Sequence, residues 1–448
     1  MAPEPWPTDV LPELARRAAD WPVVVLDDDP TGTQAIRDLP VLTEWDAERI
    51  ERHLDEPALF LSTNSRALEA DAAAAVTRDA ASCARQAASV TWRPVSFVSR
   101  SDSTLRGHFP QEVEALAEGA GLADPRILLA PYFGEGGRVT IEDGHFLELE
   151  GVRTPVAQTE FSQDATFGFR SSNLREWVAE KYATAGRATP PIASLPLSLV
   201  REGGPAAVAE ALRRLAPGGV AIANAEIDRD IEVLALGTLL AEEHDLPLVA
   251  RTAASYVRAR AGQPRARPLE PAERGASGPG LIVVGSHVPT TTAQVAALPT
   301  HAGDAIAVHE LAIDAILAGD PSVIADAAAV LDRALAGGRT GLVMTERARR
   351  DIGLAGGRSV SEALVAVVRA ITERPAWVIA KGGITSYDVA RYGLGLVEAR
   401  IAGPLLPGVP VWVGGADARW PSVPLVVFPG NVGGAGALVD AYRALTGR

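Results

Sequence analysis

The stretch that most constrains the fold is VVVLDDDPTGTQ, residues 23–34, in which four apolar residues run directly into three aspartates. Residues 23–26 are typical of a strand buried on both faces of a parallel sheet. Asp27, Asp28 and Asp29 then meet a Pro-Thr-Gly turn. Ligands of open α/β sheets bind outside the carboxyl ends of the strands, so this turn predicts a site for a hydroxyl proton or a divalent cation. A solvated turn is the alternative, because Asp, Pro and Gly all favour turns.

The order of strand, polar turn and helix recurs after this turn, and it predicts a largely parallel sheet flanked by helices. The strand at 58–61 ends on the turn STNSR, which precedes an Ala-rich helix. The hydroxyl of Ser65 and the guanidinium of Arg66 suit an anionic, polyhydroxylated ligand. A helix cap built by Asn64 or Ser65 explains the same residues without a ligand.

A denser polar turn, RSDSTLRGH at residues 100–108, follows the strand at 95–99. Arg100 and Arg106 can pair with a carboxylate or a phosphate, and Asp102 can bind sugar hydroxyls together with neighbouring Ser and Thr side chains. Structural loops rarely concentrate so many hydrogen-bonding side chains, so we interpret this turn as part of a binding site.

A glycine-rich loop that carries Arg138 and His145 follows the strand at 127–130. Its glycines allow the backbone to approach a ligand closely, and the imidazole has the chemistry of an acid or base. A plain surface hairpin and a hydrogen-bonded structural histidine are the alternatives, which the sequence leaves open. The polar stretch 151–178 beyond this loop is predicted to be irregular.

Residues 263–280, rich in Pro, Gly, Ala and Arg, form the clearest linker in the chain. They predict an N-terminal domain at 1–262 and a C-terminal domain at 281–448. A chain of 448 residues is long enough for two such domains. Each is expected to be an α/β domain with a largely parallel sheet flanked by helices.

Three strands of the second domain run into turns that suit a nucleotide. The strand at 281–284 continues into Gly-Ser and a Thr-rich helix start, and the strand at 377–381 continues into Gly-Gly and a capping-box pattern at 385–388. The strand at 425–428 is followed by PGNVGG. Free amides at a helix start bind phosphate, with a plain helix cap as the alternative. The turns match neither a Walker A loop nor a G-x-G-x-x-G fingerprint.

The net charge of −14 argues against nucleic acid or an anionic membrane surface as the main partner. The single cysteine, Cys83, excludes an intrachain disulfide and a Cys-based zinc site. The first ten residues show no signal peptide, and no uncharged apolar run reaches the length of a membrane span. We therefore expect a soluble, cytoplasmic protein, and a homodimer is a guess at its oligomeric state.

The motifs DDDPTGTQ, STNSR, SDSTLRGH, GRVT, VVGSH, KGGITSYDVA and PGNVGG occur in this order along nearly the whole chain. Together they resemble the four-carbon acid sugar kinase family. The resemblance implies that ATP, with Mg²⁺, phosphorylates a terminal hydroxyl of threonate, erythronate or 3-oxo-tetronate in a cleft between a sugar-acid domain and an ATP domain. The chain departs from more familiar members at Pro30, at Thr33-Gln34 and at Phe428-Pro429-Gly430. A branched C5 acid such as 3-oxo-isoapionate is therefore the alternative substrate.

The same motifs suggest individual roles. One of Asp28, Asp29 and Asp102 is expected to orient or deprotonate the substrate hydroxyl, and the metal ligands stay open. The residues expected to bind the sugar acid are Thr31, Gly32, Ser65, Arg66, Asp102, Ser103 and Arg106, with the two arginines on its carboxylate. Those expected to bind ATP are Ser286, Gly382, Gly383, Thr385 and Gly430, and the surrounding loops add Lys381, Ile384, Asn431 and Gly433.

Two other classes of protein are alternatives to a kinase: a different enzyme acting on similar acids, and a non-catalytic sensor. An NAD-dependent dehydrogenase lacks support because the sequence has no dinucleotide fingerprint. An aldolase lacks support because the motifs of the first domain contain no lysine that could form a Schiff base, and the chain contains no zinc-binding cluster. A non-catalytic sugar-acid sensor would need a DNA-binding or partner-binding segment, and no basic helix-turn-helix stretch occurs. A sensor would bind the acid without turning over ATP.

Overall fold

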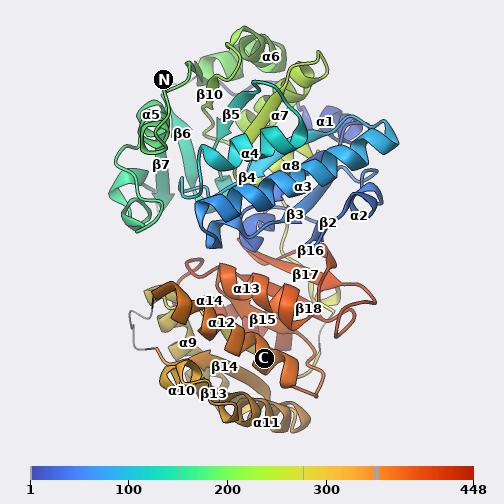
Figure 1. Cartoon of the computed structure of the whole chain (residues 1–448), viewed down its shortest axis with the longest axis vertical. Helices are drawn as coiled ribbons and strands as arrows, with labels where there is room; N and C mark the ends of the chain where they lie inside the picture. The colour runs from blue at the N-terminus through green and yellow to red at the C-terminus, as the bar shows by residue number, and fades with distance from the viewer. Residues whose placement is uncertain (1–2, 150, 276, 348–352, 448) are drawn as a thin grey trace. The chain divides into compact units, whose positions relative to one another are not determined.

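The computed structural model describes residues 3–149, 151–275, 277–347 and 353–447. The chain divides into two compact units, Met1–Ala266 and Arg267–Arg448, each of which is described by itself (Figure 1). The division falls inside the predicted linker, of which residue 276 lies outside the described residues.

The first unit is built on a parallel sheet with the strand order β2-β3-β1-β4-β11-β5-β10-β9. In the order of the chain, β2 and β3 lie on one side of β1, and the next strand, β4, lies on the other side. This reversal opens a crevice outside the carboxyl ends of β1 and β4, where the predicted acidic and arginine-rich turns begin. The strands are β1 (Val23–Asp27), β2 (Leu39–Leu42), β3 (Ala58–Ser62), β4 (Ser96–Arg100), β5 (Arg126–Ala130), β9 (Ile192–Leu195), β10 (Val220–Ala223) and β11 (Leu248–Thr252).

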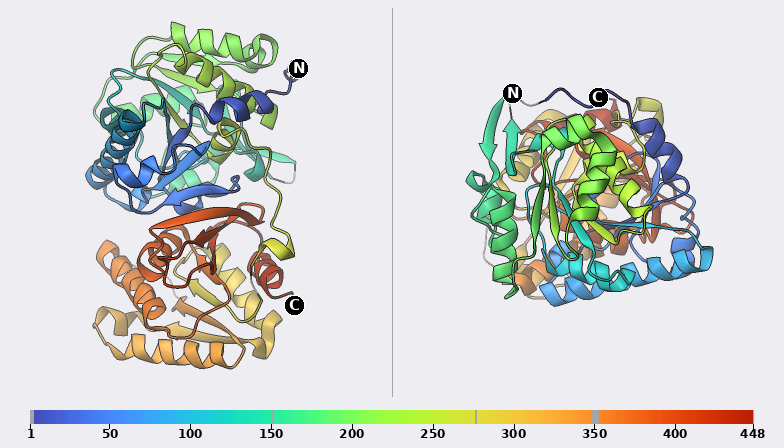
Figure 2. Two further views of the ribbon diagram at one scale, coloured as in Figure 1. Left: turned by 90° about the vertical axis from the view of Figure 1, so that its right-hand side faces the viewer. Right: turned by 90° about the horizontal axis from the view of Figure 1, so that it is seen from above.

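Helices cover both faces of this sheet. The long α3 packs along α4 on one face, whereas α7 packs against α6 and α8 on the other (Figures 1 and 2). Small residues of α3 such as Ala80 and Ala84 let it lie close to α4 over the buried strands. The helices are α1 (Leu11–Ala18), α2 (Ala47–Glu51), α3 (Ala70–Thr91), α4 (Gln111–Ala120), α5 (Leu174–Thr184), α6 (Gly204–Arg214), α7 (Asp228–Glu242) and α8 (Ala254–Arg260), with short turns η1 (Pro30–Thr33) and η2 (Ser65–Ala67).

A small antiparallel sheet lies beside the main sheet of the first unit (Figure 2). It consists of β6 (Arg138–Ile141), β7 (Gly144–Leu149) and β8 (Val152–Pro155). The glycine-rich loop is therefore a hairpin, as the alternative interpretation had it. The prediction that 151–178 is irregular is wrong at both ends, because β8 and the start of α5 fall within it.

The second unit has the strand order β13-β14-β12-β15-β18-β17-β16, in which the first five are parallel and the last two antiparallel. Chain order reverses around β12, so its crevice lies at the carboxyl ends of β12 and β15. The strands are β12 (Leu281–Val284), β13 (Ile306–Leu311), β14 (Thr340–Thr345), β15 (Val378–Lys381), β16 (Glu398–Leu406), β17 (Val409–Gly414) and β18 (Pro424–Phe428). The helices are α9 (Pro289–Ala302), α10 (Ile313–Leu317), α11 (Ser322–Ala336), α12 (Gly353–Ala370), α13 (Gly383–Asp388) and α14 (Ala437–Thr446).

The predicted fold class, two α/β domains on largely parallel sheets, is confirmed. The capping box at 385–388 is wrong, because α13 already begins at Gly383 and Thr385 lies inside it. Among the described residues, the helices are all too short or too polar to cross a membrane.

Candidate functional site

Three aspartates and two arginines meet at the carboxyl end of β1. Arg66 grips Asp28 with Nε and Nη2, its Nε lying 3.0 Å from Oδ2, and its Nη1 lies 3.4 Å from Asp29 Oδ2. Arg100, at the end of β4, places Nη1 3.1 Å from Asp27 Oδ1 and 3.4 Å from Asp28 Oδ1. The predicted acidic turn is therefore neutralised by arginines, and both oxygens of Asp28 accept hydrogen bonds from them.

The neighbouring turn fixes Asp29. Its Oδ1 accepts a 2.8 Å hydrogen bond from the amide of Thr31, the second residue of η1. Burial by itself raises the pKa of Asp29, but Arg66 and the Thr31 amide outweigh it, and the pKa lies below its usual range. Asp29 is consequently an anion whose two oxygens are both engaged.

Asp27 lies deeper than the other two aspartates. Burial raises its pKa to about 8, and its Oδ2 has no hydrogen-bond partner among the described residues. Gly32 packs directly against it, since a Cβ at position 32 would stand 2.0 Å from Asp27 Oδ1. Gly32 is thus required by this close approach.

Ser65 and Arg66 lie in η2, beside the acidic turn. The Oγ of Ser65 donates to Glu112 Oε1 and accepts from Thr63 Oγ1 at 3.1 Å. Neither Asn64 nor Ser65 caps α3, because that helix begins at Ala70. The helix-cap interpretation of STNSR is therefore wrong.

The polar turn after β4 is organised around Asp102. Its Oδ2 accepts from Arg106 Nε at 2.7 Å and from the hydroxyl of Thr104. Burial opposes ionisation, but Arg106 and Arg66 hold the pKa of Asp102 far below its usual range. Its Oδ1 forms no hydrogen bond with the part of the chain that the structure describes, which leaves one acceptor of this carboxylate available.

His145 supports that turn from the hairpin. Its Nε2 lies 2.8 Å from the carbonyl oxygen of Ser103, and its Nδ1 lies 2.9 Å from Thr140 Oγ1. Burial lowers the pKa of His145 to about 4. The imidazole is a neutral structural group with both nitrogens engaged, as the alternative interpretation proposed.

Two buried charged groups near these turns were missed by sequence reasoning. Burial, with the charge of Asp28 nearby, raises the pKa of Glu112 in the first turn of α4 to about 7. Arg251 of β11 lies over the rings of Phe109 and Trp177 and donates to the carbonyl of Arg106 at 3.1 Å. Its place at the carboxyl end of a parallel strand was the signal that could have found it.

In the second unit, three strand-to-helix turns converge on Ser286, which follows β12. A Cβ at Gly382 would stand 3.0 Å from the Ser286 Cβ, and one at Gly430 would stand 2.9 Å from its Oγ. Gly382 has φ +115°, which only glycine adopts readily. The Oγ1 of Thr385 would lie 2.3 Å from a Cβ at Gly285. Gly382 and Gly430 thus lie directly against Ser286, and Thr385 lies against the neighbouring Gly285.

Lys381 is fully buried under the third of these turns. Its Nζ donates to the carbonyls of Pro429 and Gly430 and lies 4.2 Å from the centroid of the Phe428 ring. Burial lowers its pKa to about 7. The ammonium group is therefore used to hold the loop that follows β18.

The other predicted nucleotide residues lie around these contacts. Gly383 begins α13, and Ile384 next to it is exposed. Asn431 is exposed in the loop after β18, and Gly433 takes a positive φ there. The buried amide of Gln294 in α9 donates to three carbonyls of that loop, at residues 432–434.

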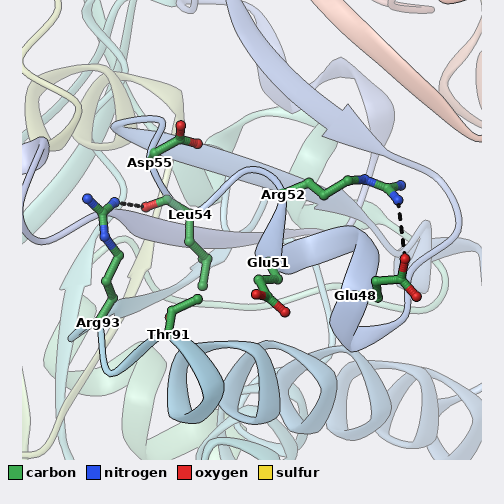
Figure 3. Close-up of a pocket in the computed structure, with 7 residues that line it drawn as sticks. All are labelled: Glu48, Glu51, Arg52, Leu54, Asp55, Thr91 and Arg93. Carbon is green, nitrogen blue, oxygen red and sulfur yellow. Dashed lines mark hydrogen bonds and ion pairs between the residues drawn. The ribbon is translucent and has the colours of Figure 1, made fainter.

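A hollow of about 550 Å³ lies elsewhere, at the amino ends of β3 and β4 (Figure 3). Its two arginines have partners within it, since Arg93 donates to the Leu54 carbonyl and Arg52 lies 3.9 Å from Glu48. It is at the opposite edge of the sheet from the acidic turn, so we do not assign the site there. The residues that line it are Glu48, Glu51, Arg52, Leu54, Asp55, Thr91 and Arg93.

A metal site built from protein alone would need several ligating side chains to lie close together among the described residues. None of their His, Cys, Asp and Glu side chains forms a group of three or more that could hold a metal ion. The turns after β12, β15 and β18 carry no carboxylate at 285–288, 382 and 429–436, and Ser286 is the hydroxyl-bearing residue in these ranges.

Family models of known proteins match both parts of the chain. A family model described as a sugar-binding N-terminal domain matches residues 23–260, and one described as a nucleotide-binding C-terminal domain matches 281–438. A D-erythronate kinase of Heliobacterium modesticaldum is 26% identical over 286 residues, a match that spans 62% of this chain and 60% of that enzyme.

Two solved structures share the fold. A Salmonella typhimurium LT2 protein, provisionally called a tRNA synthase, superposes with a TM-score of 0.68 at 18% identity, covering 95% of this chain and 99% of the other. A Haemophilus influenzae protein from a family of unknown function gives 0.60 at 16% identity, covering 94% and 99%. With matched models over both halves of the chain and a kinase relative, the protein belongs to the four-carbon acid sugar kinase family.

Proposed function

We propose that this chain is an ATP-dependent kinase that phosphorylates a terminal hydroxyl of a short sugar acid. The observation that carries the proposal is the pairing of two sites: an aspartate and arginine site in the first unit and a glycine-lined nucleotide site in the second. Each lies at the crevice of its own parallel sheet, where ligands of such sheets bind. The kinase relative and the two family models support the same activity.

Among the three predicted carboxylates, Asp102 is the best candidate to contact the reacting hydroxyl. The oxygens of Asp28 and Asp29 are engaged by Arg66, Arg100 and the turn amide, whereas Oδ1 of Asp102 has no partner among the described residues. Phosphoryl transfer passes through a loose transition state and depends mainly on positioning, so a carboxylate of low pKa can orient the hydroxyl.

The residues of the second unit fit a nucleotide. Contacts of 3.0 Å or less at Gly382 and Gly430 show that side chains would fill the space beside Ser286, so glycines keep backbone amides accessible to phosphate. Ser286, Thr291 and Thr385 supply hydroxyls around the same turns. Mg²⁺ bound there would be coordinated chiefly by phosphate oxygens, since these turns carry no carboxylate.

The proposal is tested by a coupled ADP-release assay with Mg-ATP on threonate, erythronate, their 3-oxo forms and branched C5 acids. We expect turnover on one class of acid, and a fall in kcat of about 100-fold or more in Asp102→Asn. Asp71→Asn, which changes an exposed aspartate of α3, should match the wild type.

Acid binding without ADP release would overturn the kinase and favour a sensor. Failure to bind any acid would overturn the substrate class. An unchanged kcat in Asp102→Asn would move the role to Asp28 or Asp29. The placing of the active site in a cleft between the domains stays a prediction, as do the substrate and the oligomeric state.

A further inference from the structure

The arginines around the sugar-acid site fall into two groups. Arg66, Arg100 and Arg106 each form an ion pair with an aspartate of the site. Arg138 and the buried Arg251 form no ion pair with a carboxylate in the described ranges of the chain; Arg251 lies over two aromatic rings and donates to a backbone carbonyl, whereas Nε of Arg138 is left without a partner there. Because burying an unpaired charge is costly and a guanidinium pairs bidentately with a carboxylate, Arg138 is a candidate to bind an anion from outside the chain.

The hairpin places Arg138 beside the polar turn after β4. Residues 138 and 140 of β6 share one face, because side chains alternate along a strand. Thr140 contacts His145 on that face, and His145 contacts the carbonyl of Ser103. Val139, on the opposite face, lines a separate hollow of about 320 Å³. Arg138 therefore faces the turn that holds Asp102.

The guanidinium of Arg138 is oriented but not saturated. Its Nη1 donates to the carbonyl of Gly136, and its Cζ lies 6.0 Å from the centroid of the Phe133 ring. Its Nε is buried without a hydrogen bond among the described residues. The edge formed by Nε and Nη2 is thus free, and Arg66 uses that same edge to grip Asp28.

The electrostatic surroundings agree with this geometry. Burial lowers the pKa of Arg138, whereas the charges of Asp102 and Glu160 act to raise it and that of Arg106 to lower it. The negative charge of Asp102 is already matched by Arg106 at 2.7 Å. Arg106 also lies 3.7 Å from Asp164, so it is Arg138 that has no carboxylate at ion-pair distance among the described residues and could pair with an additional one.

We propose that Arg138 binds the carboxylate of the sugar acid through Nε and Nη2 and so selects acids over uncharged polyols. This rests on the proposed function and revises the expectation that Arg66 and Arg106 hold the carboxylate. Those two arginines instead fix Asp28, Asp29 and Asp102. The hairpin is then a specificity element that closes one side of the site.

The test compares the acid that the wild type prefers with the amide of the same acid, which lacks the charge. In Arg138→Met, we expect KM for the acid to rise about 10- to 100-fold, the range of a charge-assisted hydrogen bond, with kcat changed far less. KM for the amide should stay the same. Arg138→Lys keeps the charge but not the planar guanidinium, so its KM for the acid should lie between those of the wild type and Arg138→Met.

Arg153→Met is the matched control, because Arg153 lies on β8 of the same small sheet and pairs with Glu148 and Glu226 at the surface. It should behave like the wild type. If Arg138→Met does not fold, Arg138→Gln carries the same comparison. Equal changes in KM for acid and amide, or no change in either, would overturn the proposal.

The proposed function and this inference fail in different ways. If calorimetric titration of the wild type shows no acid binding at all, the substrate class itself is wrong. If the wild type binds the acid and Arg138→Met binds it equally well, only the role of Arg138 is wrong. Binding of ADP should be the same in both proteins, which shows that the second unit is intact.

Discussion

Lys181 and Lys381, the two lysines of the chain, each direct the ammonium group at a pair of backbone carbonyls. Lys181 bonds the carbonyls of Phe167 and Gly168 at 3.1 and 2.8 Å, just as Lys381 holds the loop after β18. An ammonium group offers three donors on a flexible stem, which suits the fastening of an irregular loop. At the residue scale, much of the buried charge in this protein positions backbone around the sites.

Glu242 provides a pH test of buried charge away from either site. It accepts a 2.6 Å hydrogen bond from Ser96, and burial raises its pKa to about 7 from the ordinary 4.5. A raised carboxyl pKa means that the folded state binds the proton more tightly. Its contribution to stability is complete below pH 4.5 and is lost as the pH rises through 7.

Glu242→Gln removes this titration. The free energy of unfolding of the variant minus that of the wild type should therefore increase as the pH rises from 5 to 8, by up to about 3 kcal/mol. Denaturant unfolding followed across that range measures the difference. Glu48→Gln, on the exposed face of α2, should show no such trend. A difference that is independent of pH would contradict the assignment.

Individual site residues differ in how visible they are in the sequence. Asp28, Asp29 and Arg66 follow apolar strands directly, so their place at a sheet edge could be predicted. Arg251 lies at the carboxyl end of β11 and could have been found by the same rule, whereas Glu112 could not, because it lies in the first turn of a helix and not at the end of a strand. Ion pairs between residues far apart in the sequence are equally hard to predict. Nothing in the local sequence indicates that Arg66 forms an ion pair with Asp28, 38 residues away.

At the scale of elements, the nucleotide site depends on the turn between β15 and α13. Gly382 has φ +115° and ψ +145°, a conformation almost restricted to glycine, and an added Cβ would press on Ser286. Gly434, in the turn after β18, has open space around its Cβ position and no positive φ.

Gly382→Ala should therefore destabilise the second unit by about 1–3 kcal/mol and weaken nucleotide binding. Gly434→Ala should change stability by no more than about 0.5 kcal/mol. Thermal unfolding with and without ADP compares the two. Equal effects of both substitutions would show that backbone conformation at Gly382 is not what shapes the turn.

Strands followed by polar turns could be predicted because a strand buried on both faces is a run of apolar residues, as in β1 and β12. The strands β13, β16 and β17 were missed. In β13, buried and exposed residues are mixed around His309 and Glu310, and β16 and β17 carry Gly and Pro next to a register shift. The capping-box motif failed because tertiary contacts of Gly382 set the helix start one turn earlier.

At the scale of the whole molecule, each unit contains its own sheet, its own hydrophobic core and its own crevice. The core of the first unit packs α3 and α4 on apolar strands, and that of the second includes residues of α9 and α14. Independent cores predict that the two units unfold as separate cooperative transitions. Each ligand should then act on one transition only.

A ligand that binds only the native form stabilises it by RT ln(1 + [L]/Kd), about 2.7 kcal/mol at a hundredfold excess over Kd. By differential scanning calorimetry, ADP should raise the melting temperature of Arg267–Arg448, and the sugar acid that of Met1–Ala266, by a few degrees each. Hydrogen exchange of peptides from each unit assigns the transitions. A single transition that both ligands raise would show instead that the two units unfold together, and the separate cores would then not set the cooperativity of the chain.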